Sequence, residues 1–440
     1  MTNMTRRGLL AAGAALAVAP HPIPGAQFSG GNRANGAKDV TGFDGVRRAT
    51  SAAVESGDIP GALSVVWKDG RVRCTQLSGV RDIESHAPVE LSTLFAIASM
   101  SKPVTVAVAL MLVDQGVFKL DDPITRWAPE FANMRVLRRA DGPLDDTYPA
   151  PRAISIEDLM THRSGLSYSF LAQGPLAGAL FAKFGMGIES KLSPDEWLRE
   201  LAAVPLAYAP GERYNYGHSI DVLGFVVGRA AGRSLRQVMH ERLFDPLGMV
   251  DTDFWIPPAK RARAAGIYFS PGAGDFKPTP VSGFFGDGPP AYTSGGQGLV
   301  STAPDYLKFA RLLLGAGAVG GKRLLRAATV KRMTQDHLSQ AQRRLPFMGG
   351  VPWDGLGFGL GMPVVVGTGP AWGGAGVGSF GWGGAFGGWW QADPTRNAIL
   401  LWLQSCLPAP PVPGKPLSPR VPGAMGVAEF QRRANAALDD

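Results

Sequence analysis

The sequence is short of the residues that build disulfide frameworks and metal centres. Its 440 residues include two cysteines, Cys74 and Cys406, and six histidines. Two cysteines exclude a scaffold of several disulfides and a cysteine-rich metal site, although they could pair with each other if the two ends of the chain meet. The histidines show no metal-ligand spacing of the His-x-x-x-His kind, so we predict neither a structural zinc nor a cofactor.

Long runs of one charge and long apolar runs are also missing. The formal net charge is +8, but the 44 basic residues are scattered among 36 acidic ones. This distribution predicts a solvated surface and no nucleic-acid partner. Glycine and proline interrupt the apolar residues 170–208, which are therefore unsuited to span a membrane. With 45% hydrophobic residues, the chain is long enough for a large core and more than one domain.

The N-terminal 26 residues have the pattern of a signal peptide. Arg6 and Arg7 precede an apolar, alanine-rich stretch that ends at Ala19, and the arginine pair resembles a twin-arginine signal. Cleavage near Ala26 or after Ala19 would make the protein periplasmic or secreted, with no transmembrane segment after removal of the signal. The alternative is a frayed N-terminus on a cytoplasmic protein.

A serine and a lysine three residues apart open one apolar helical stretch. Ser99 and Lys102 precede the run 104–113, and Gly116 is a plausible end of the helix. Residues at this spacing share a helix face, so an amine would lie beside a hydroxyl. A serine hydroxyl needs such a base to become a nucleophile. Ser-x-x-Lys alone is a weak pattern, and the simpler interpretation is an N-cap serine followed by a solvated lysine.

Two later stretches decide between these interpretations. Tyr216 stands in a glycine-containing turn before a predicted helix over 220–231, and Trp382-Gly383-Gly384 stands on a predicted strand. Glycines within a strand mark close approach of a ligand or of another backbone segment. The Gly-x-Ser-x-Gly motif of the α/β-hydrolases is absent.

Local patterns predict further elements around these motifs. They are a helix over 46–56, a hairpin of 61–67 with 72–77, a short helix within 154–166, helices within 170–208, a helix capped by Thr302, a strand over 398–403 and a last helix over 427–438. His162 and Arg163 invite a catalytic interpretation. We prefer a structural one, in which both are cations near a helix C-terminus.

Taken in order, Ser99-x-x-Lys102, Tyr216 and Trp382-Gly383-Gly384 resemble the motifs of the serine β-lactamase and penicillin-binding-protein superfamily. The resemblance is strongest to its class C-like branch and, within that branch, to the family VIII carboxylesterases. It covers about residues 45–405. The supporting segments are 120–123, 159–166, 210–212, 221–224 and 298–302.

The resemblance implies an α+β fold with an antiparallel sheet, flanking helices and an inserted helical domain, and an active site at their junction. We therefore expect a sheet domain from 40–98 and 290–438 and a mainly helical domain over 99–289. The resemblance makes Ser99 the acylated nucleophile and gives the proton transfers to Lys102 and Tyr216. The backbone N–H groups of Ser99 and Ala385 would form the oxyanion hole, and Trp382, Gly383, Gly384 and His218 would lie at the substrate.

Two departures from the superfamily pattern bear on the substrate. His218 replaces the asparagine of Tyr-x-Asn, and Trp382 replaces the lysine of Lys-Thr-Gly, which removes a cation for a substrate carboxylate. Both changes favour short to medium acyl esters over β-lactams. A β-lactamase, D-aminoacyl peptidase, amide hydrolase or acyltransferase of the same fold is the alternative, and a non-catalytic acylatable sensor is another. The sequence leaves the oligomeric state open.

Overall fold

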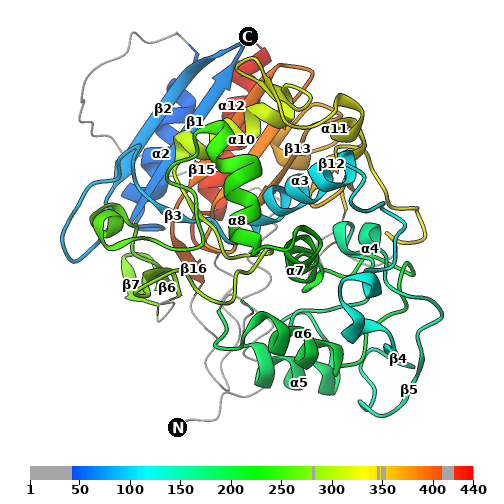
Figure 1. Cartoon of the computed structure of the whole chain (residues 1–440). Coiled ribbons are helices and arrows are strands. Elements are labelled where there is room, and N and C mark those ends of the chain that lie inside the picture. Colours follow the sequence, from blue (N-terminus) through cyan, green and yellow to red (C-terminus); the bar gives the residue numbers. More distant parts are fainter. Residues whose placement is uncertain are drawn as a thin grey trace.

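A computed structural model describes residues 42–185, 187, 189–279, 283–343, 347, 353–408 and 421–439 (Figure 1). The predicted signal peptide lies outside these residues. The largest sheet has the order β11-β12-β13-β14-β15-β1-β2, and all its neighbouring strands are antiparallel. Its strands are β1 (Gly61–Lys68), β2 (Arg71–Gly79), β11 (Leu356–Phe358), β12 (Pro363–Val365), β13 (Phe380–Gly383), β14 (Trp389–Asp393) and β15 (Ala398–Leu403). The predicted hairpin, the predicted strand over 398–403 and the predicted fold class are confirmed.

The two ends of the chain build the centre of this sheet together. β1 pairs with β15 along its length, with Leu63 opposite Leu403 and Lys68 opposite Ala398. The turn from β1 to β2 is tight because Asp69 and Gly70 both have positive φ, 49° and 83°, as a two-residue hairpin turn requires. The central strands are buried on both faces, which explains their nearly continuous apolar sequences.

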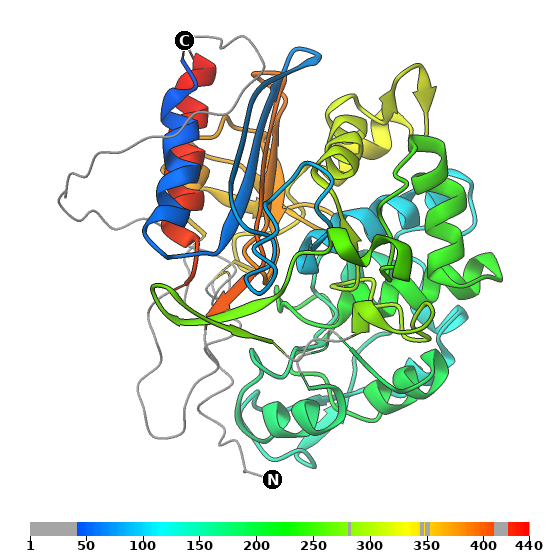
Figure 2. The ribbon, with the colours of Figure 1, turned by 90° about the vertical axis from the view of Figure 1, so that its left-hand side faces the viewer.

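Helices cover both faces of the sheet. On one face α2 (Asp44–Glu55) and α12 (Ala424–Asp439) lie side by side, as Figure 2 shows in blue and red. Trp402 and Phe430 pack together in the apolar cluster of that face. On the other face lie α3 (Ser101–Asp114), α10 (Ala303–Leu314) and α11 (Ala327–Met333).

Most of the chain between β2 and β11 is helical and irregular. Besides α3, α10 and α11, its α-helices are α4 (Ile156–Met160), α5 (Gly174–Phe184), α6 (Pro194–Ala202), α7 (Ser219–Ala231), α8 (Leu235–Met239) and α9 (Asp245–Leu247). Short strand pairs join β3 (Phe95–Ala96) to β8 (Val300–Ser301), β4 (Arg135–Leu137) to β5 (Thr147–Pro149), and β9 (Ala318–Val319) to β10 (Lys322–Arg323), while β6 (Tyr268–Gly272) lies between β7 (Asp275–Pro278) and β16 (Cys406–Pro408). One continuous apolar cluster joins these helices to the sheet, and the predicted domain boundaries stay a prediction.

Helix ends follow the capping chemistry that the sequence indicates. The Ser155 hydroxyl accepts the Asp158 N–H and opens α4, and Thr302 caps α10 through the N–H of Asp305. Gly232 ends α7 in a left-handed conformation with φ 65°. Cys74 and Cys406 are both buried, and no disulfide joins them. Within the described ranges, no helix combines the length and apolarity that crossing a membrane requires.

Candidate active site

Ser99 lies in a single 3₁₀ turn, Ala98–Met100, directly before α3. The sequence predicted that the long helix itself would begin here, but the regular helix starts two residues later. The backbone explains the difference, because Ala98 has a positive φ of 43° and turns the chain sharply out of β3. The Ile97 N–H donates to Leu299 O at 3.0 Å and fixes this turn against the strand pair β3–β8. Ser99 therefore lies in a short turn, the serine turn, whose backbone is held in place by the strand pair β3–β8.

The three residues predicted as catalytic meet at one oxygen atom. The Ser99 Oγ lies 3.1 Å from the Lys102 Nζ and 2.8 Å from the Tyr216 Oη. Ser99 is 1% exposed, Lys102 is 0% exposed and Tyr216 is 3% exposed. A solvated lysine next to a helix cap, the simpler sequence interpretation, is therefore wrong for this site. The distances from the Ser99 Oγ to the Lys102 Nζ and to the Tyr216 Oη are those at which a nucleophile and a base exchange a proton.

The surroundings of Lys102 favour its neutral form. Burial lowers the pKa of Lys102 to about 7, and the carboxylate of Asp221 acts in the opposite direction. The Nζ also donates to Gly296 O at 2.9 Å and lies 4.6 Å from the centre of the Tyr216 ring. Lys102 is therefore an amine that can accept a proton near neutral pH.

Tyr216 has the opposite tendency. Burial raises the pKa of its hydroxyl, and the hydrogen bond to Ser99 only partly offsets this effect. Its ring packs between His162 at 4.5 Å, Tyr168 at 5.5 Å and Trp382 at 5.7 Å, measured between ring centroids. At neutral pH the tyrosine is a proton donor, and the lysine is the base of the pair.

A buried carboxylate that the sequence did not single out lies behind Lys102. Asp221 is 0% exposed and accepts the Gly296 N–H at 3.0 Å and the Tyr168 hydroxyl at 3.1 Å. Burial alone would raise the pKa of Asp221, but the hydrogen bond and charge of His218, then Lys102 and Ser294, lower it below its usual value. An acidic residue in the first turn of an otherwise apolar helix was the available signal, because such a residue is rarely buried without partners.

His218, which we predicted to lie at the substrate, contacts the buried Asp221 carboxylate instead of Ser99. Its Nδ1 lies 3.1 Å from the Asp221 Oδ2, and the side chain is 1% exposed. Its ring packs against Tyr168, Phe184 and Trp197 at 4.4 to 5.5 Å between centroids. The His218 ring bonds to Asp221 and packs among aromatic side chains, which favours a supporting role, and a role in substrate binding stays a prediction.

The strand that carries Trp382, Gly383 and Gly384 lies directly beside the serine turn. A Cβ on Gly384 would come within 2.3 Å of Ile97 O and 3.7 Å of the Ala98 Cβ, so only glycine permits this close approach. β13 ends at Gly383, and Gly384 and Ala385 follow it. An oxyanion hole formed by the backbone N–H groups of Ser99 and Ala385 stays a prediction.

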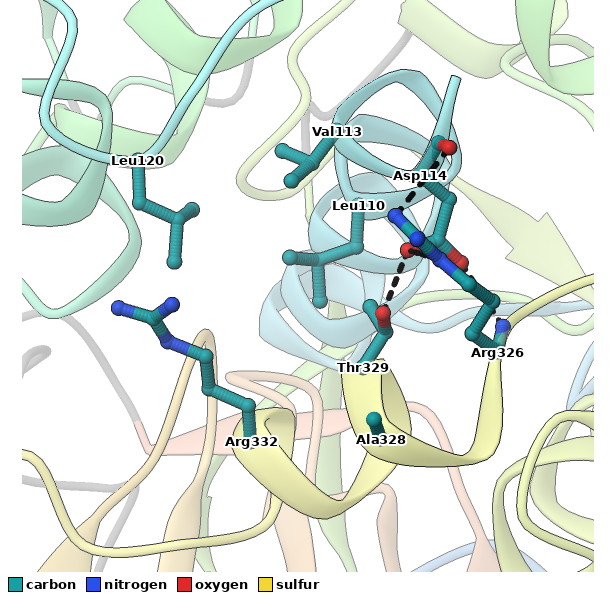
Figure 3. Close-up of a pocket in the computed structure, with 8 residues that line it drawn as sticks. All are labelled: Leu110, Val113, Asp114, Leu120, Arg326, Ala328, Thr329 and Arg332. Atoms are coloured by element: carbon teal, nitrogen blue, oxygen red, sulfur yellow. Dashed lines mark hydrogen bonds and ion pairs between the residues drawn. The ribbon is translucent and has the colours of Figure 1, made fainter. Parts of the chain in front are cut away.

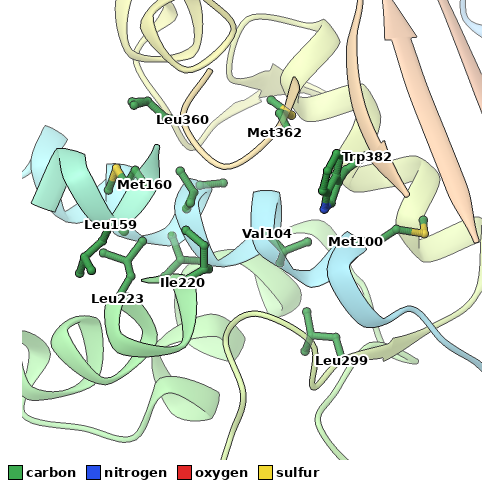
Figure 4. Close-up of a cluster of buried hydrophobic side chains, with 14 of the residues drawn as sticks. Met100, Val104, Leu159, Met160, Ile220, Leu223, Leu299, Leu360, Met362 and Trp382 are labelled. Carbon is green, nitrogen blue, oxygen red and sulfur yellow. The ribbon is translucent and has the colours of Figure 1, made fainter. Parts of the chain in front are cut away.

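Trp382 places an aromatic wall where the related motif carries a cation. Figure 4 shows its side chain hanging from β13 over the first turn of α3, with Met100 and Val104 nearby. It is 3% exposed, and its ring lies 5.6 Å from Phe347 and 6.2 Å from Phe358 between centroids. This wall is apolar and has no charge to offer a substrate carboxylate.

His162 and Arg163 differ from the pair of cations near a helix C-terminus that we expected. His162 is 0% exposed, and burial followed by the nearby Lys102 charge lowers its pKa well below its usual value. The imidazole is therefore neutral. Arg163 is charged and paired, with a guanidinium nitrogen 2.9 Å from the Glu157 Oε1. The expectation is wrong for His162 because the helix ends at Met160 and the chain turns inward.

A separate cavity of about 280 Å³ lies at the far end of α3 (Figure 3). Its apolar wall is formed by Leu110, Val113 and Leu120. On the other side Arg326 pairs with Asp114 at 2.9 Å, and Arg332 reaches over the opening. None of the predicted site residues lines it.

Comparison with known proteins identifies the family. The model of the Beta-lactamase family matches residues 46–415. The chain belongs to the beta-lactamase family. It is 44% identical over 369 residues to Protein Rv1367c of Mycobacterium tuberculosis, covering 83% of this chain and 90% of that protein. It is 32% identical over 378 residues to Esterase EstB of Burkholderia gladioli, covering 80% of this chain and 87% of the esterase.

A solved structure supports the same assignment. EstCE1, described as a hydrolase with promiscuous acyltransferase activity, superposes with a TM-score of 0.71 at 28% identity. The alignment covers 88% of this chain and 97% of EstCE1. The resemblance to family VIII carboxylesterases within the β-lactamase and penicillin-binding-protein superfamily is confirmed, and this beta-lactamase family member is a serine hydrolase.

Proposed function

We propose that this protein cleaves carboxylic esters of short to medium acyl chains through an acyl-enzyme on Ser99. The observation that carries the proposal is the meeting of Lys102 Nζ and Tyr216 Oη at the Ser99 Oγ, at 3.1 and 2.8 Å. A hydroxyl bound by an amine and a phenol in a water-poor pocket has both a proton acceptor and a proton donor at hand.

The two pKa directions divide the work. Neutral Lys102 turns its lone pair to the Ser99 hydroxyl and takes the proton, while one N–H stays on Gly296 O. The Ser99 oxygen bonds to the ester carbonyl carbon, and the negative oxygen that forms is held by backbone N–H groups, each worth about 3–4 kcal/mol in the transition state. The C–O bond to the alcohol then breaks, and Tyr216 gives its proton to the leaving alkoxide.

The resting state is recovered by the reverse sequence with water. The ammonium of Lys102 returns its proton to the Tyr216 phenolate. The Lys102 Nζ lies 4.6 Å from the centre of the Tyr216 ring. The same pair then removes a proton from the attacking water, and Ser99 is released with its own proton. An alcohol in place of water would make the second step an acyl transfer, and the likeness to EstCE1 supports this as a second activity.

The environment of Trp382 supports neutral substrates. A buried indole against Tyr216 provides apolar surface and no cation, so a substrate carboxylate would lose water without gaining a partner. β-Lactams and peptides with a free C-terminus carry such a carboxylate, whereas simple esters do not. We therefore expect hydrolysis of p-nitrophenyl acetate and butyrate to exceed that of nitrocefin.

The test is a rate comparison on these three compounds with two matched variants. Ser99→Ala should lose ester turnover, whereas Ser101→Ala should keep much of it at a lower melting temperature. Ser101 accepts the Leu299 N–H at 3.1 Å, and loss of that acceptor costs about 1–3 kcal/mol of stability. Preferred turnover of nitrocefin, or ester turnover by Ser99→Ala, would contradict the proposal.

We also propose that the protein is exported to the periplasm or secreted. Arg6 and Arg7 ahead of an apolar stretch support this localisation.

A further inference from the structure

His162 adopts a backbone conformation that a residue with a side chain rarely takes. It follows α4 with a φ of 53°, in the left-handed region that favours glycine. The side chain is fully buried, so its conformation cannot be attributed to a free surface loop. A strained, buried residue next to an active site is a reason to ask what the strain maintains.

Three contacts join His162 to the turn that carries Tyr216. Its backbone oxygen accepts the Asn215 N–H at 2.7 Å, and its Nδ1 accepts the Gly217 N–H at 3.4 Å. Its ring packs on the Tyr216 ring with 4.5 Å between centroids. The histidine thus holds the residues before and after the tyrosine and supports the tyrosine ring itself.

The neighbouring backbone leaves this turn little freedom. A Cβ on Gly217 would come within 2.2 Å of Leu166 O, so the turn is pressed against the segment that follows His162. The side-chain nitrogen of Asn215 donates to Leu166 O at 2.9 Å and to the Ser167 Oγ at 2.7 Å. Segment 162–167 therefore packs directly against the turn 215–217, which carries Tyr216.

The charge state of His162 suits this role. Nδ1 can accept the Gly217 N–H only when that nitrogen carries no proton, which assigns the proton of the neutral ring to Nε2. A protonated imidazole would place two N–H groups against each other. Buried Nε2 has no hydrogen-bond partner among the described residues, so Nδ1 makes the side chain's polar contact.

We infer that His162 is a positioning residue, which holds the Tyr216 hydroxyl at hydrogen-bond distance from Ser99 by bracketing the turn 215–217. The inference rests on the proposed ester hydrolysis. Since misplacement of a catalytic group by about 1 Å can cost about 10²-fold in rate, loss of the bracket should lower kcat more than it changes KM.

Two substitutions separate the acceptor from the shape of the residue. His162→Asn places an amide oxygen near the Nδ1 position and tolerates positive φ, so it should keep kcat for p-nitrophenyl butyrate within about 3-fold. His162→Leu removes the acceptor and should lower kcat by about 10-fold or more, with KM changed by less than about 3-fold. If His162→Leu does not fold, His162→Gln replaces it, because its amide extends past the Nδ1 position.

His86 provides the matched control. It is exposed and has the same φ of 53°. His86→Asn and His86→Leu carry the same changes in backbone preference without any contact to Tyr216. Both should leave kcat and KM unchanged.

A double-mutant cycle with Tyr216→Phe gives the decisive readout. Without a phenolic hydroxyl to position, His162→Leu should change the remaining kcat by less than about 2-fold. A loss of equal size in both backgrounds, or a His162→Asn variant as impaired as His162→Leu, would overturn the positioning role. Absence of Ser99-dependent ester turnover in the unsubstituted protein would instead overturn the proposed function.

Discussion

Asp221 and Lys102 hold the two polar groups of one residue, Gly296. The Asp221 Oδ1 accepts the Gly296 N–H at 3.0 Å, and the Lys102 Nζ donates to the Gly296 oxygen at 2.9 Å. The carboxylate thus acts on the lysine in two ways, through its charge and through the backbone that orients the amine. A side chain at Gly296 would force its neighbours to shift, because its Cβ would lie 2.9 Å from the Tyr168 hydroxyl and 3.0 Å from both Asp221 carboxylate oxygens.

Removal of either proton carrier should disable the enzyme. We expect Lys102→Ala and Tyr216→Phe each to lower kcat for p-nitrophenyl butyrate by more than about 10²-fold, the low end for a lost general acid or base. The double variant should be only slightly slower than the worse single variant, because the two groups act on one oxygen atom. Steady-state kinetics of the four proteins measure this.

His218→Ala is the contrasting variant. It should cost much less in kcat than Tyr216→Phe but should lower the melting temperature, because it leaves the buried Asp221 carboxylate without its imidazole. If His218→Ala removes activity and Tyr216→Phe does not, a Ser-His mechanism must replace the Lys-Tyr mechanism.

The rate should depend on pH through Lys102. Its pKa of about 7 predicts that kcat/KM falls as the pH decreases through 7, where the amine becomes protonated and stops acting as a base. Asp221→Asn removes the carboxylate that raises this pKa, so the midpoint should move to lower pH. A pH–rate profile from 5 to 9 on p-nitrophenyl acetate, corrected for spontaneous hydrolysis, measures both midpoints; an unmoved midpoint in Asp221→Asn would contradict the assignment.

Stability should respond to the same group with a defined sign. Between about pH 7 and the ordinary lysine pKa of 10.5, the unfolded chain binds a proton that the folded chain has lost. The contribution of Lys102 to the free energy of unfolding therefore rises with pH across this window. Lys102→Met should stabilise the protein most at pH 7 and progressively less toward pH 10. Urea unfolding of both proteins at pH 7, 8.5 and 10 tests this, and a gain that is constant with pH would refute it.

The close approach of β13 to the serine turn gives a backbone test. Gly384→Ala should lower kcat by more than about 10-fold, since its Cβ would push Ile97 O away and displace the N–H groups that face the oxyanion. Gly272→Ala is the control, because a Cβ there meets no atom within 4 Å. Equal kinetics of the two variants would show that the close approach of Gly384 to the serine turn does not matter for catalysis.

Export can be tested on the full chain. Replacement of both Arg6 and Arg7 by lysine should leave uncleaved precursor in the cytoplasm if the arginine pair is a twin-arginine signal. Cell fractionation followed by intact-mass measurement of the purified protein reports both the location and the cleavage site. Unchanged periplasmic yield would leave only an ordinary signal peptide or none.

Local chemistry made much of this fold predictable. Asp69-Gly70 determined the hairpin turn, and Ser155, Thr302 and Gly232 marked helix ends because each residue has a side chain or backbone suited to that position. The order of the central strands was not readable in the same way, because the pairing of β1 with β15 joins segments at opposite ends of the chain.

Site residues could be predicted where their spacing in the sequence indicates a reaction. They could not be predicted where their role depends on which side chains are buried together. Ser99 and Lys102 were found from their separation, and Tyr216 from its place before a helix. The charge of His162 was predicted wrongly because a histidine after a short helix resembles a cation at a helix C-terminus, and only the three-dimensional structure shows that it faces Tyr216. Gly217 was the available hint, since a residue without Cβ allows the tyrosine turn to approach the backbone of Leu166 closely.

The pairing of β1 with β15 also determines when the enzyme can become active. A ribosome releases the N-terminal strands long before the C-terminal strands exist, so β1 can pair with β2, but its edge toward β15 stays unpaired while most of the chain is made. Such distant contacts give a high contact order and slow folding. The serine turn packs against the end of β13, which is also synthesised late. Catalytic competence therefore arises only after synthesis is almost complete, and a prematurely terminated chain should carry Ser99 without a formed site.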